Sequence, residues 1–313
     1  MNTSTIASTD KMIAVLRPRF GEQLKENQPL SEHTTFHIGG PARLFIECRR
    51  QADLVDAVNL AHAENYRYFI LGGGSNLLVS DRGFDGLIIH VANAELKVED
   101  DHILVDAGYD WEEYVEYCCS NGLAGAENMA GIKGSIGGAI YGNAGAFGCS
   151  IADILIEAEI LSPGQAPRWE KNNYFAFSYR NSILKRTKEV VLRAKLKYEK
   201  SSPQQLISKK DEILALRDQR HPKNDCSAGC FFKNIEKADE PYGKLAAGKL
   251  LEQVGAKEMK IGGARVFDKH ANILINSGTA SAEDVRKLAE ILKKRVKDEY
   301  GYDLEEEITF LGD

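Results

Sequence analysis

Apolar and polar residues alternate along the chain in two ways, which together predict a mixture of helices and strands. Helical spacing and helix-forming composition predict helices at residues 51–65, 111–120, 204–220 and 281–297. Short apolar runs bounded by glycine or polar residues predict strands at residues 42–48, 68–71, 86–91, 103–107, 190–198 and 307–311. Before residue 30 we expect one helix, followed by a polar connection that ends at Pro29.

Signals at the ends of these elements divide the chain into three blocks. The first is a strand–helix–strand arrangement with a glycine turn at its centre, and a glycine-rich block follows after residue 92. The third begins near Pro203, with a helix that Pro222 limits. Ser281 is the expected N-cap of the last helix. At 313 residues, the length favours two domains.

Composition excludes several classes of protein. Asp and Glu number 46 against 40 Lys and Arg, for a net charge of −6, which argues against a nucleic-acid binder. No apolar run approaches the roughly 18 residues needed to cross a bilayer, and the N-terminus lacks the basic start of a signal peptide. The six cysteines are scattered, so we expect reduced thiols in a cytoplasmic protein.

The first glycine segment, GGGSNLLV, directly follows a predicted strand. Consecutive glycines let backbone N–H groups converge on an anion such as a pyrophosphate, and Ser75 and Asn76 add side-chain donors. A tight turn is the alternative. A dinucleotide-binding Rossmann turn is disfavoured, because extended chain and not a helix follows the glycines.

The second glycine segment is AGIKGSIGGAIYGNAGAFG, within residues 122–148. Its glycine density allows a long flat cofactor to lie against bare backbone, and Ile132, Ile136 and Ile140 supply apolar anchors that flexible linkers lack. We interpret it as a cofactor wall, with a mobile loop as the alternative. The stretch from Gly243 to Leu250 matches GxxxxGK, but its Leu and Ala residues favour a structural helix.

Three polar positions are candidates for chemistry. Arg180, in FAFSYRNSILK, has the planar head to hold a carboxylate or an oxyanion, although a structural arginine is the commoner case. The Cys226 and Cys230 pair fits neither a zinc site nor a redox motif well, and a single thiol there is able to donate a proton. Strand alternation places Glu305 and Glu307 on one face, without deciding which carboxylate enters a cleft.

Taken together, the motifs resemble the UDP-N-acetylenolpyruvoylglucosamine reductase (MurB) family. In that family's order the chain carries HTTFHIGGPAR, ILGGGSNLLVSDRGFDGLII, GIKGSIGGAIYGNAGAFG, FSYRNSILK, SAGCFFKN, KLAAGKLLEQVGAK, HANILIN and LEEEITFLG. The resemblance implies an α+β fold with an FAD-binding domain of the vanillyl-alcohol-oxidase (PCMH) type. That domain would cover residues 1–200, in subdomains of about 1–91 and 92–200, and an α+β substrate-binding domain would cover residues 201–313.

The resemblance also implies an activity, UDP-N-acetylmuramate dehydrogenase. NADPH reduces bound FAD, which then reduces UDP-N-acetylglucosamine enolpyruvate to UDP-N-acetylmuramate in peptidoglycan precursor synthesis. The implied FAD-binding residues are Gly72, Gly73, Gly74, Ser75, Asn76, Leu77, Ser135, Ile136, Gly137, Gly138, Asn143, Gly145 and Ala146. The implied catalytic residues are Arg180, Cys230 and Glu307, the implied substrate contacts are Tyr179, Arg220, Asn234 and His270, and no metal is implied.

The chain departs from the family pattern at a few positions. Cys230 stands where the family usually has a serine proton donor, and Lys133 stands where proline is common. The short stretch between Arg180 and Cys230 resembles the subtype that lacks an inserted tyrosine loop. Another FAD-dependent oxidoreductase of the same fold and a non-catalytic nucleotide-sugar-binding protein are the alternatives, and we expect a monomer.

Overall fold

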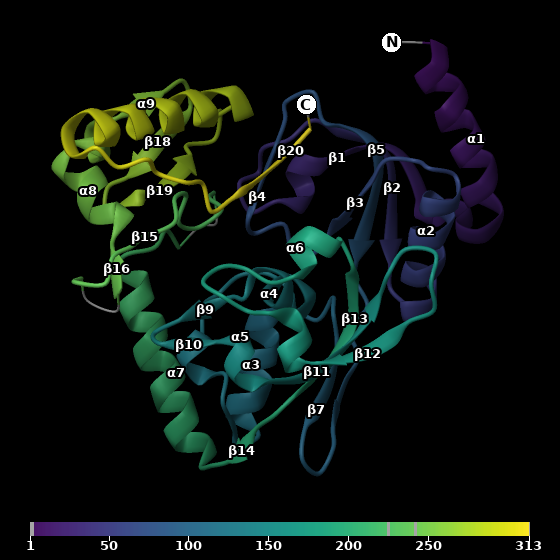
Figure 1. Cartoon of the computed structure of the whole chain (residues 1–313), viewed down its shortest axis with the longest axis horizontal. Coiled ribbons are helices and arrows are strands. Elements are labelled where there is room, and N and C mark those ends of the chain that lie inside the picture. The colour runs from purple at the N-terminus through teal and green to yellow at the C-terminus, as the bar shows by residue number, and fades with distance from the viewer. Residues whose placement is uncertain (1–2, 224–225, 241–242, 313) are drawn as a thin grey trace. The chain divides into compact units, whose positions relative to one another are not determined.

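The chain forms two compact units in the computed structural model, which describes residues 3–223, 226–240 and 243–312 (Figure 1). Unit 1 comprises Met1–Gln28, Ala42–Gly73 and Asp85–Ala215, and unit 2 comprises Pro29–Pro41, Gly74–Phe84 and Leu216–Asp313. The units are therefore interleaved along the chain, whereas the sequence analysis assigned contiguous domains. That assignment of functional domains stays a prediction.

The N-terminal part of unit 1 is a four-stranded sheet with two helices. The strands, in the order β1-β2-β5-β3, are β1 (Leu24–Pro29), β2 (Pro41–Cys48), β5 (Phe84–Val91) and β3 (Tyr68–Leu71), and β3 runs parallel to β5. The helices are α1 (Thr3–Phe20) and α2 (Gln51–Ala63), which contact each other. Arg19 of α1 donates hydrogen bonds to Asp53 and Asp56 of α2, at 2.7 and 2.6 Å.

The predicted polar connection before Pro29 is wrong over most of its length. Residues 24–29 form β1, an edge strand in which only Leu24 is buried. An edge strand with one buried side chain has no apolar alternation to reveal it. The strand–helix–strand order and the strand and helix positions predicted for residues 42–91 are confirmed.

The second part of unit 1 is a five-stranded antiparallel sheet in the order β12-β11-β13-β7-β6. Its strands are β6 (Leu96–Val98), β7 (Ile103–Asp106), β11 (Leu155–Leu161), β12 (Arg168–Lys171) and β13 (Val190–Leu196). The helices of this part are α3 (Trp111–Ser120), α4 (Ile136–Gly142), α5 (Ile151–Ile154), α6 (Leu184–Thr187) and the start of α7 (Pro203–Asp218). Two small pairs complete it, β8 (Leu123–Ala124) with β14 (Glu199–Lys200) and β9 (Gly145–Ala146) with β10 (Cys149–Ser150). Helix α4 packs against β7 and β13, and its side chains join the core of unit 1.

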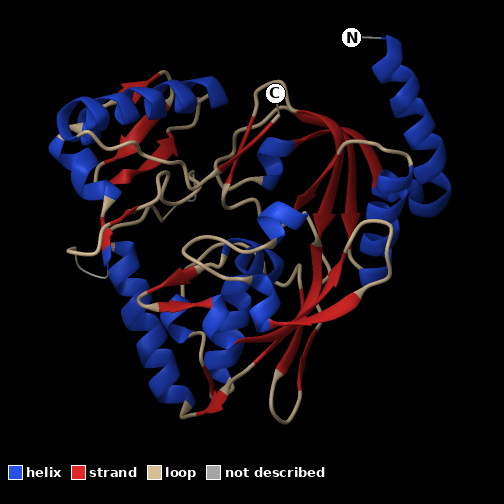
Figure 2. Cartoon of the chain, viewed as in Figure 1, coloured by secondary structure: helices blue, strands red, loops and turns tan. Residues whose placement is uncertain are grey.

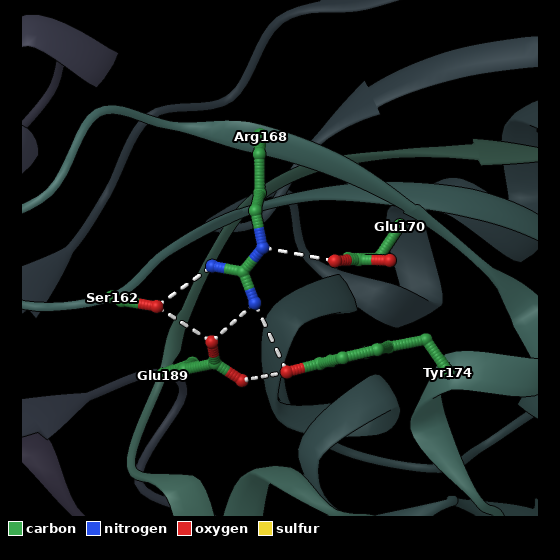
Figure 3. Close-up of polar contacts among 5 residues, drawn as sticks. All are labelled: Ser162, Arg168, Glu170, Tyr174 and Glu189. Carbon is green, nitrogen blue, oxygen red and sulfur yellow. Dashed lines mark hydrogen bonds and ion pairs between the residues drawn. The ribbon is translucent and has the colours of Figure 1, made fainter.

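A buried polar network supports the connection between β12 and β13 (Figure 3). The Glu189 carboxylate accepts hydrogen bonds from Ser162, Arg168 and Tyr174 at 2.6–2.7 Å. The Arg168 guanidinium also binds Glu170 at 2.9 Å. These hydrogen bonds lower the pKa of Glu189 to about 2, although burial of the carboxylate alone would raise it. The network fixes Tyr174, in the segment that leads to Arg180.

Unit 2 is built on a three-stranded sheet with two helices. Its strands, in the order β17-β18-β19, are β17 (Lys260–Ile261), β18 (Ala264–Phe267) and β19 (His270–Asn276). The helices α8 (Ala247–Gln253) and α9 (Ala282–Tyr300) contact this sheet and each other (Figure 2). Two further pairs are β4 (Leu77–Val79) with β20 (Thr309–Leu311), which are parallel, and β15 (Ile235–Glu236) with β16 (Lys244–Leu245).

The start of α9 agrees with the sequence analysis, and the GxxxxGK stretch agrees with it in part. The Ser281 hydroxyl accepts a hydrogen bond from the Asp284 N–H, so Ser281 is the N-cap that was predicted. The Asp81 carboxylate accepts from the N–H groups of Ala282 and Glu283, which stabilises the same helix end. The GxxxxGK stretch is helical only from Ala247, where α8 begins, whereas Lys244–Leu245 form strand β16 instead of the expected helix. Among the residues that the structure describes, no helix is both long enough and apolar enough to cross a membrane.

Candidate active site

In unit 1 the two glycine segments meet at the end of β3. A Cβ atom on Gly73 would lie 2.7 Å from the Gly134 Cα, and one on Gly72 would lie 2.7 Å from the Ser135 Oγ. Only a residue without a side chain allows this approach of two backbones. The structure thus brings together Gly72, Gly73 and Ser135, which the sequence analysis placed in one cofactor site.

Helix α4 lies in the second glycine segment, which the sequence analysis interpreted as a cofactor wall without assigning it a helix. Ser135 is its N-cap and accepts from the Gly138 N–H at 3.3 Å. Ile136 and Ile140 are buried at helical spacing, and a Cβ on Gly137 would lie 3.0 Å from the Ala107 Cβ. Three glycines within seven residues conceal the helix, because glycine has a low helix propensity.

The C-terminal end of α4 contacts the turn that carries Arg180. Asn143, in the left-handed conformation that ends the helix, donates from Nδ2 to the Ser178 carbonyl at 2.8 Å. Arg180 donates from Nη1 to the Gly145 carbonyl in β9 at 2.9 Å, and its guanidinium lies 5.6 Å from the centre of the Tyr179 ring. The predicted catalytic arginine therefore lies beside Asn143 and Gly145, two predicted cofactor-binding residues.

In unit 2 the rest of the first glycine segment pairs with the C-terminus. Gly74 has φ +61, and a Cβ there would lie 2.0 Å from the His33 carbonyl oxygen. Asn76 donates from Nδ2 to the carbonyl of Glu307 at 3.0 Å, and β4 begins at Leu77, opposite Thr309 of β20. The structure therefore brings Asn76 next to Glu307, although the two are far apart in the sequence.

A second pairing brings Cys230 to the same segment. The Glu307 N–H donates to the Phe231 carbonyl at 2.8 Å, and Phe232 forms an antiparallel bridge with Glu306. On its other side, Cys230 forms a bridge with Ile273 of β19. The Cys230 segment thus lies between β19 and residues 305–307, so the predicted proton donor and the predicted glutamate sit on directly paired segments.

The three consecutive carboxylates differ in their contacts. Glu305 is mostly exposed and lies 3.1 Å from the Lys233 Nζ, while Glu306 lies 2.8 Å from the Lys293 Nζ on α9. Glu307 is the one whose backbone binds both Asn76 and the Cys230 segment. These main-chain contacts place residue 307 beside Asn76 and the Cys230 segment, and the choice of Glu307 among the three carboxylates stays a prediction.

Asn272 is a structural residue of the site that the sequence analysis did not single out. Its side chain accepts from the Phe232 N–H at 2.9 Å and donates to the Phe232 carbonyl at 2.8 Å, and only 2% of its surface is exposed. A buried asparagine between apolar residues of the HANILIN strand is the sequence signal, because such a side chain needs hydrogen-bond partners. Asn272 fixes the segment that follows Cys230.

The predicted substrate contacts of unit 2 lie near the start of β19 and of α8. The Asn234 Oδ1 accepts from the Ala247 N–H at 3.1 Å, at the start of α8. The rings of His221 and His270 lie 5.8 Å apart. Burial is the main cause that lowers the pKa of both imidazoles, that of His221 to about 4. The Arg220 cation adds to the effect at both, and the Arg217 cation adds to it at His221. The imidazoles therefore lie in a positive field, which suits an anionic ligand.

Cys226 and Cys230 are not placed to form a disulfide with each other. The Asn276 N–H donates to the Cys226 carbonyl, whereas Cys230 pairs with Ile273, so the two cysteines flank different points of β19. Positions 273 and 276 are about 10 Å apart along an extended strand, beyond the roughly 7 Å that a disulfide spans. Neither cysteine forms a disulfide, and in the described part of the chain no three His, Cys, Asp or Glu side chains are grouped to hold a metal.

Comparison with known proteins gives consistent matches over nearly the whole chain. Residues 42–164 match a family model described as an FAD-binding domain, and residues 221–311 match the C-terminal domain of UDP-N-acetylenolpyruvoylglucosamine reductase. These matches confirm the predicted fold class, an α+β FAD-binding domain followed by a C-terminal domain of this reductase type.

Relatives with this name are similar along their full length. The chain is 36% identical over 298 residues to the UDP-N-acetylenolpyruvoylglucosamine reductase of Solibacter usitatus, covering 91% of this chain and 95% of the relative. It is 38% identical over 296 residues to that of Caldicellulosiruptor bescii, covering 94% and 92%. The crystal structure of MurB from Thermus caldophilus superimposes with a TM-score of 0.78 at 30% identity, covering 92% of this chain and 99% of that one. The chain belongs to the UDP-N-acetylenolpyruvoylglucosamine reductase family.

Proposed function

We propose that this protein is a UDP-N-acetylmuramate dehydrogenase that reduces UDP-N-acetylglucosamine enolpyruvate at the expense of NADPH. The reaction belongs to peptidoglycan precursor synthesis, and we place it in the cytoplasm. The observation that carries the proposal is the pairing of the Cys230 segment with that of Glu307, within a chain that matches this family over most of its length. A thiol and a carboxylate on adjacent backbone segments suit a reaction that needs one proton at carbon.

The residues present fit an FAD molecule. At the junction of Gly72 and Gly73 with residues 134 and 135 there is no room for a Cβ, so bare backbone lines this part of the site. Such a surface accepts a flat dinucleotide, and converging N–H groups suit its pyrophosphate. The residues that we propose to hold it are Gly72, Gly73, Gly74, Ser75, Asn76, Leu77, Ser135, Ile136, Gly137, Gly138, Asn143, Gly145 and Ala146. When bound, FAD supplies the two-electron chemistry that links NADPH to the sugar.

Arg180 and Glu307 act on the carboxylate end of the enolpyruvyl group in this proposal. A guanidinium binds a carboxylate through two parallel N–H groups and stabilises negative charge that develops on it. The contact of Nη1 with the Gly145 carbonyl holds the guanidinium beside β9. Polarisation of the carboxylate stabilises the negative charge that develops at the carbon next to it, so the hydride adds at the terminal carbon of the double bond.

Cys230 supplies the proton at the carbon next to the carboxylate. A thiol is a stronger acid than the serine hydroxyl usual in the family, so it suits the role of proton donor. Asn272 holds the strand that follows Cys230, so the Sγ position is set by backbone pairing. We propose Tyr179, Arg220, Asn234 and His270 as contacts to the UDP-sugar, with the cationic surroundings of His270 suited to its diphosphate.

An anaerobic visible spectrum of the purified protein, titrated with NADPH and then with the enolpyruvyl sugar, tests the proposal. We expect flavin bands that bleach with NADPH and return with the sugar. Bands that bleach but return only with oxygen would indicate another FAD-dependent oxidoreductase. A colourless protein that takes up no added FAD would contradict the proposal and favour a nucleotide-sugar-binding protein.

A further inference from the structure

Arg180 occupies a backbone conformation that is unfavourable for an arginine. The N–H groups of Ser178 and Asn181 each donate to the other residue's carbonyl at 3.1 Å, so Tyr179 and Arg180 are the central residues of a tight turn. Arg180 has φ +53. The second central position of a turn with positive φ favours glycine or asparagine, because a Cβ is crowded there. Strain of this kind persists only where surrounding contacts hold the residue in place.

Lys185 makes one of the contacts that hold this turn. It lies in α6, directly after the turn, and its Nζ donates to the carbonyl of Arg180 at 2.7 Å. The same ammonium lies 5.9 Å from the ring centre of Tyr141, the residue whose carbonyl accepts a 2.7 Å hydrogen bond from the buried Ser182. A charged donor binds a carbonyl more strongly than a neutral donor does, so this contact restrains the backbone at residue 180.

Two further contacts hold the turn, one at the Ser178 carbonyl and one at the Arg180 side chain. The Asn143 side chain binds the Ser178 carbonyl at 2.8 Å, and the guanidinium of Arg180 binds the Gly145 carbonyl at 2.9 Å. Arg180 is therefore fixed at its carbonyl by Lys185 and at its side chain by Gly145. With the carbonyl contact removed, relaxation toward negative φ redirects the Cα–Cβ bond and with it the guanidinium.

We propose that Lys185 is a positioning residue for Arg180, and that its ammonium keeps the turn in the left-handed conformation in which the guanidinium is directed at the substrate carboxylate. This inference rests on the proposed function, because it assigns Arg180 to the enolpyruvyl group. Lys185 does not touch the substrate in this account. It acts through the Arg180 backbone.

The test compares Lys185→Met with Lys185→Arg in the purified flavoprotein. Methionine keeps the length and packing of the side chain on Tyr141 but donates no hydrogen bond, whereas arginine keeps a charged donor. We expect Lys185→Met to slow reoxidation of the reduced flavin by the enolpyruvyl sugar about 10- to 100-fold, the scale of a misplaced catalytic group. We expect Lys185→Arg to recover most of that loss. Lys171→Met, at an exposed lysine of the same unit, is the matched control and should react like wild type.

A double-mutant comparison separates positioning from general structural damage. If Lys185 acts only through Arg180, then Lys185→Met has no further effect on the reoxidation rate in an Arg180→Ala background. Losses that multiply in the double variant would overturn the proposal. So would a Lys185→Met enzyme that reoxidises at the wild-type rate.

Limited trypsin digestion supplies a measurement that is independent of activity. Mass spectrometry of early products gives the cleavage rate after Arg180, and we expect it to rise about tenfold in Lys185→Met because the released turn fits a protease site. An unchanged rate contradicts the proposal even if turnover falls. If the sugar does not reoxidise the wild-type flavin, the proposed function fails, and the cleavage rate still decides whether Lys185 holds the turn.

Discussion

The residues proposed for catalysis are held in different ways in the two units. In unit 1, Arg180 lies in a tight turn that side chains hold, through the Lys185 ammonium and the Asn143 amide. In unit 2, the segments of Cys230 and Glu307 are held by backbone pairing between strand-like segments. Single side-chain changes should therefore move Arg180 easily, whereas they should leave the positions of Cys230 and Glu307 largely intact.

The two units also differ in whether the groups that position the reacting side chain are themselves side chains. At Arg180 the group that reacts and the contacts that place it belong to the same few side chains. At Cys230 the thiol is the chemical group, and β19 and the C-terminal segment do the placing. Removing a side chain in unit 2 should then abolish one chemical step while the fold and the other step persist.

The largest effect is expected for Cys230→Ala. Loss of the proton donor should slow reoxidation of the flavin by the sugar by about 10²- to 10⁴-fold, the usual contribution of a general acid. Reduction by NADPH should continue at the wild-type rate, because it needs no proton from this thiol. Stopped-flow absorbance of the two half-reactions measures both rates.

Cys230→Ser is the matched variant, since it restores the residue usual in the family. We expect it to recover at least a tenth of the wild-type reoxidation rate. Equal losses of both half-reactions in Cys230→Ala would contradict the role as proton donor and indicate damage to the flavin site.

The next largest effect is on stability, at Asn272, a buried side chain that reinforces the pairing in unit 2. Asn272→Ala leaves the buried N–H and carbonyl of Phe232 without their hydrogen-bond partner. Each such group costs about 1 to 3 kcal/mol, so we expect unfolding free energy to fall by about 3 kcal/mol. Urea denaturation measures it. Asn173→Ala, at an exposed asparagine, should change it by less than about 0.5 kcal/mol.

In unit 1 the matching stabilising group is charged, the Glu189 carboxylate, whereas in unit 2 it is the neutral amide of Asn272. Glu189→Gln tests how much the charge contributes to stability. The pKa of the Glu189 carboxylate is lowered to about 2 in the folded chain, against an ordinary value of 4.5 for a glutamate. A carboxylate with a lowered pKa stabilises the fold above its unfolded pKa, and that stability is lost as the pH falls from about 4.5 to about 2. We expect the ionised carboxylate to contribute about 2 kcal/mol to the free energy of unfolding, and Glu189→Gln should lack this contribution. Urea denaturation at several pH values measures it, and Glu170→Gln, at the more exposed partner of Arg168, should keep the wild-type pH dependence.

The sequence revealed the elements whose signals are local. Helix α3 and the N-cap of α9 were predicted at their observed residues, because apolar spacing and capping residues are local signals. The candidate residues were found on motifs, and the structure brings Gly73 to Ser135, Asn76 to Glu307 and Cys230 to the Glu307 segment.

What the sequence did not reveal depends on contacts between distant segments. Helix α4 was missed because its glycines, needed for the approach to Ala107, disguise its helical spacing. Strand β1 was missed because an edge strand has few buried positions. The roles of Asn272 and Lys185 required knowledge of which carbonyl each side chain reaches, which no local pattern encodes.

The smallest expected effect uses pH to separate the two units. The pKa of His221 is lowered to about 4, mainly by burial and then by Arg217, His270 and Arg220. Above about pH 6.5 the imidazole is neutral in both the folded and unfolded chain, so it changes nothing there. As the pH falls from about 6.5 to about 4, the unfolded chain takes up the proton first, so the fold loses stability. For this partly exposed group we expect a loss of about 1 kcal/mol.

This loss lies at higher pH than the loss from Glu189, so mild acid should loosen unit 2 while unit 1 remains folded. Both tryptophans of the chain, Trp111 and Trp169, lie in unit 1, so their fluorescence reports that unit alone. Hydrogen exchange of peptides from β19 and α9 reports unit 2. At pH 5 we expect faster exchange in unit 2 with unchanged fluorescence, and His221→Gln should slow that exchange. If fluorescence and exchange change together at every pH, the two units unfold as one, and the contrast between them is confined to the placement of the catalytic side chains.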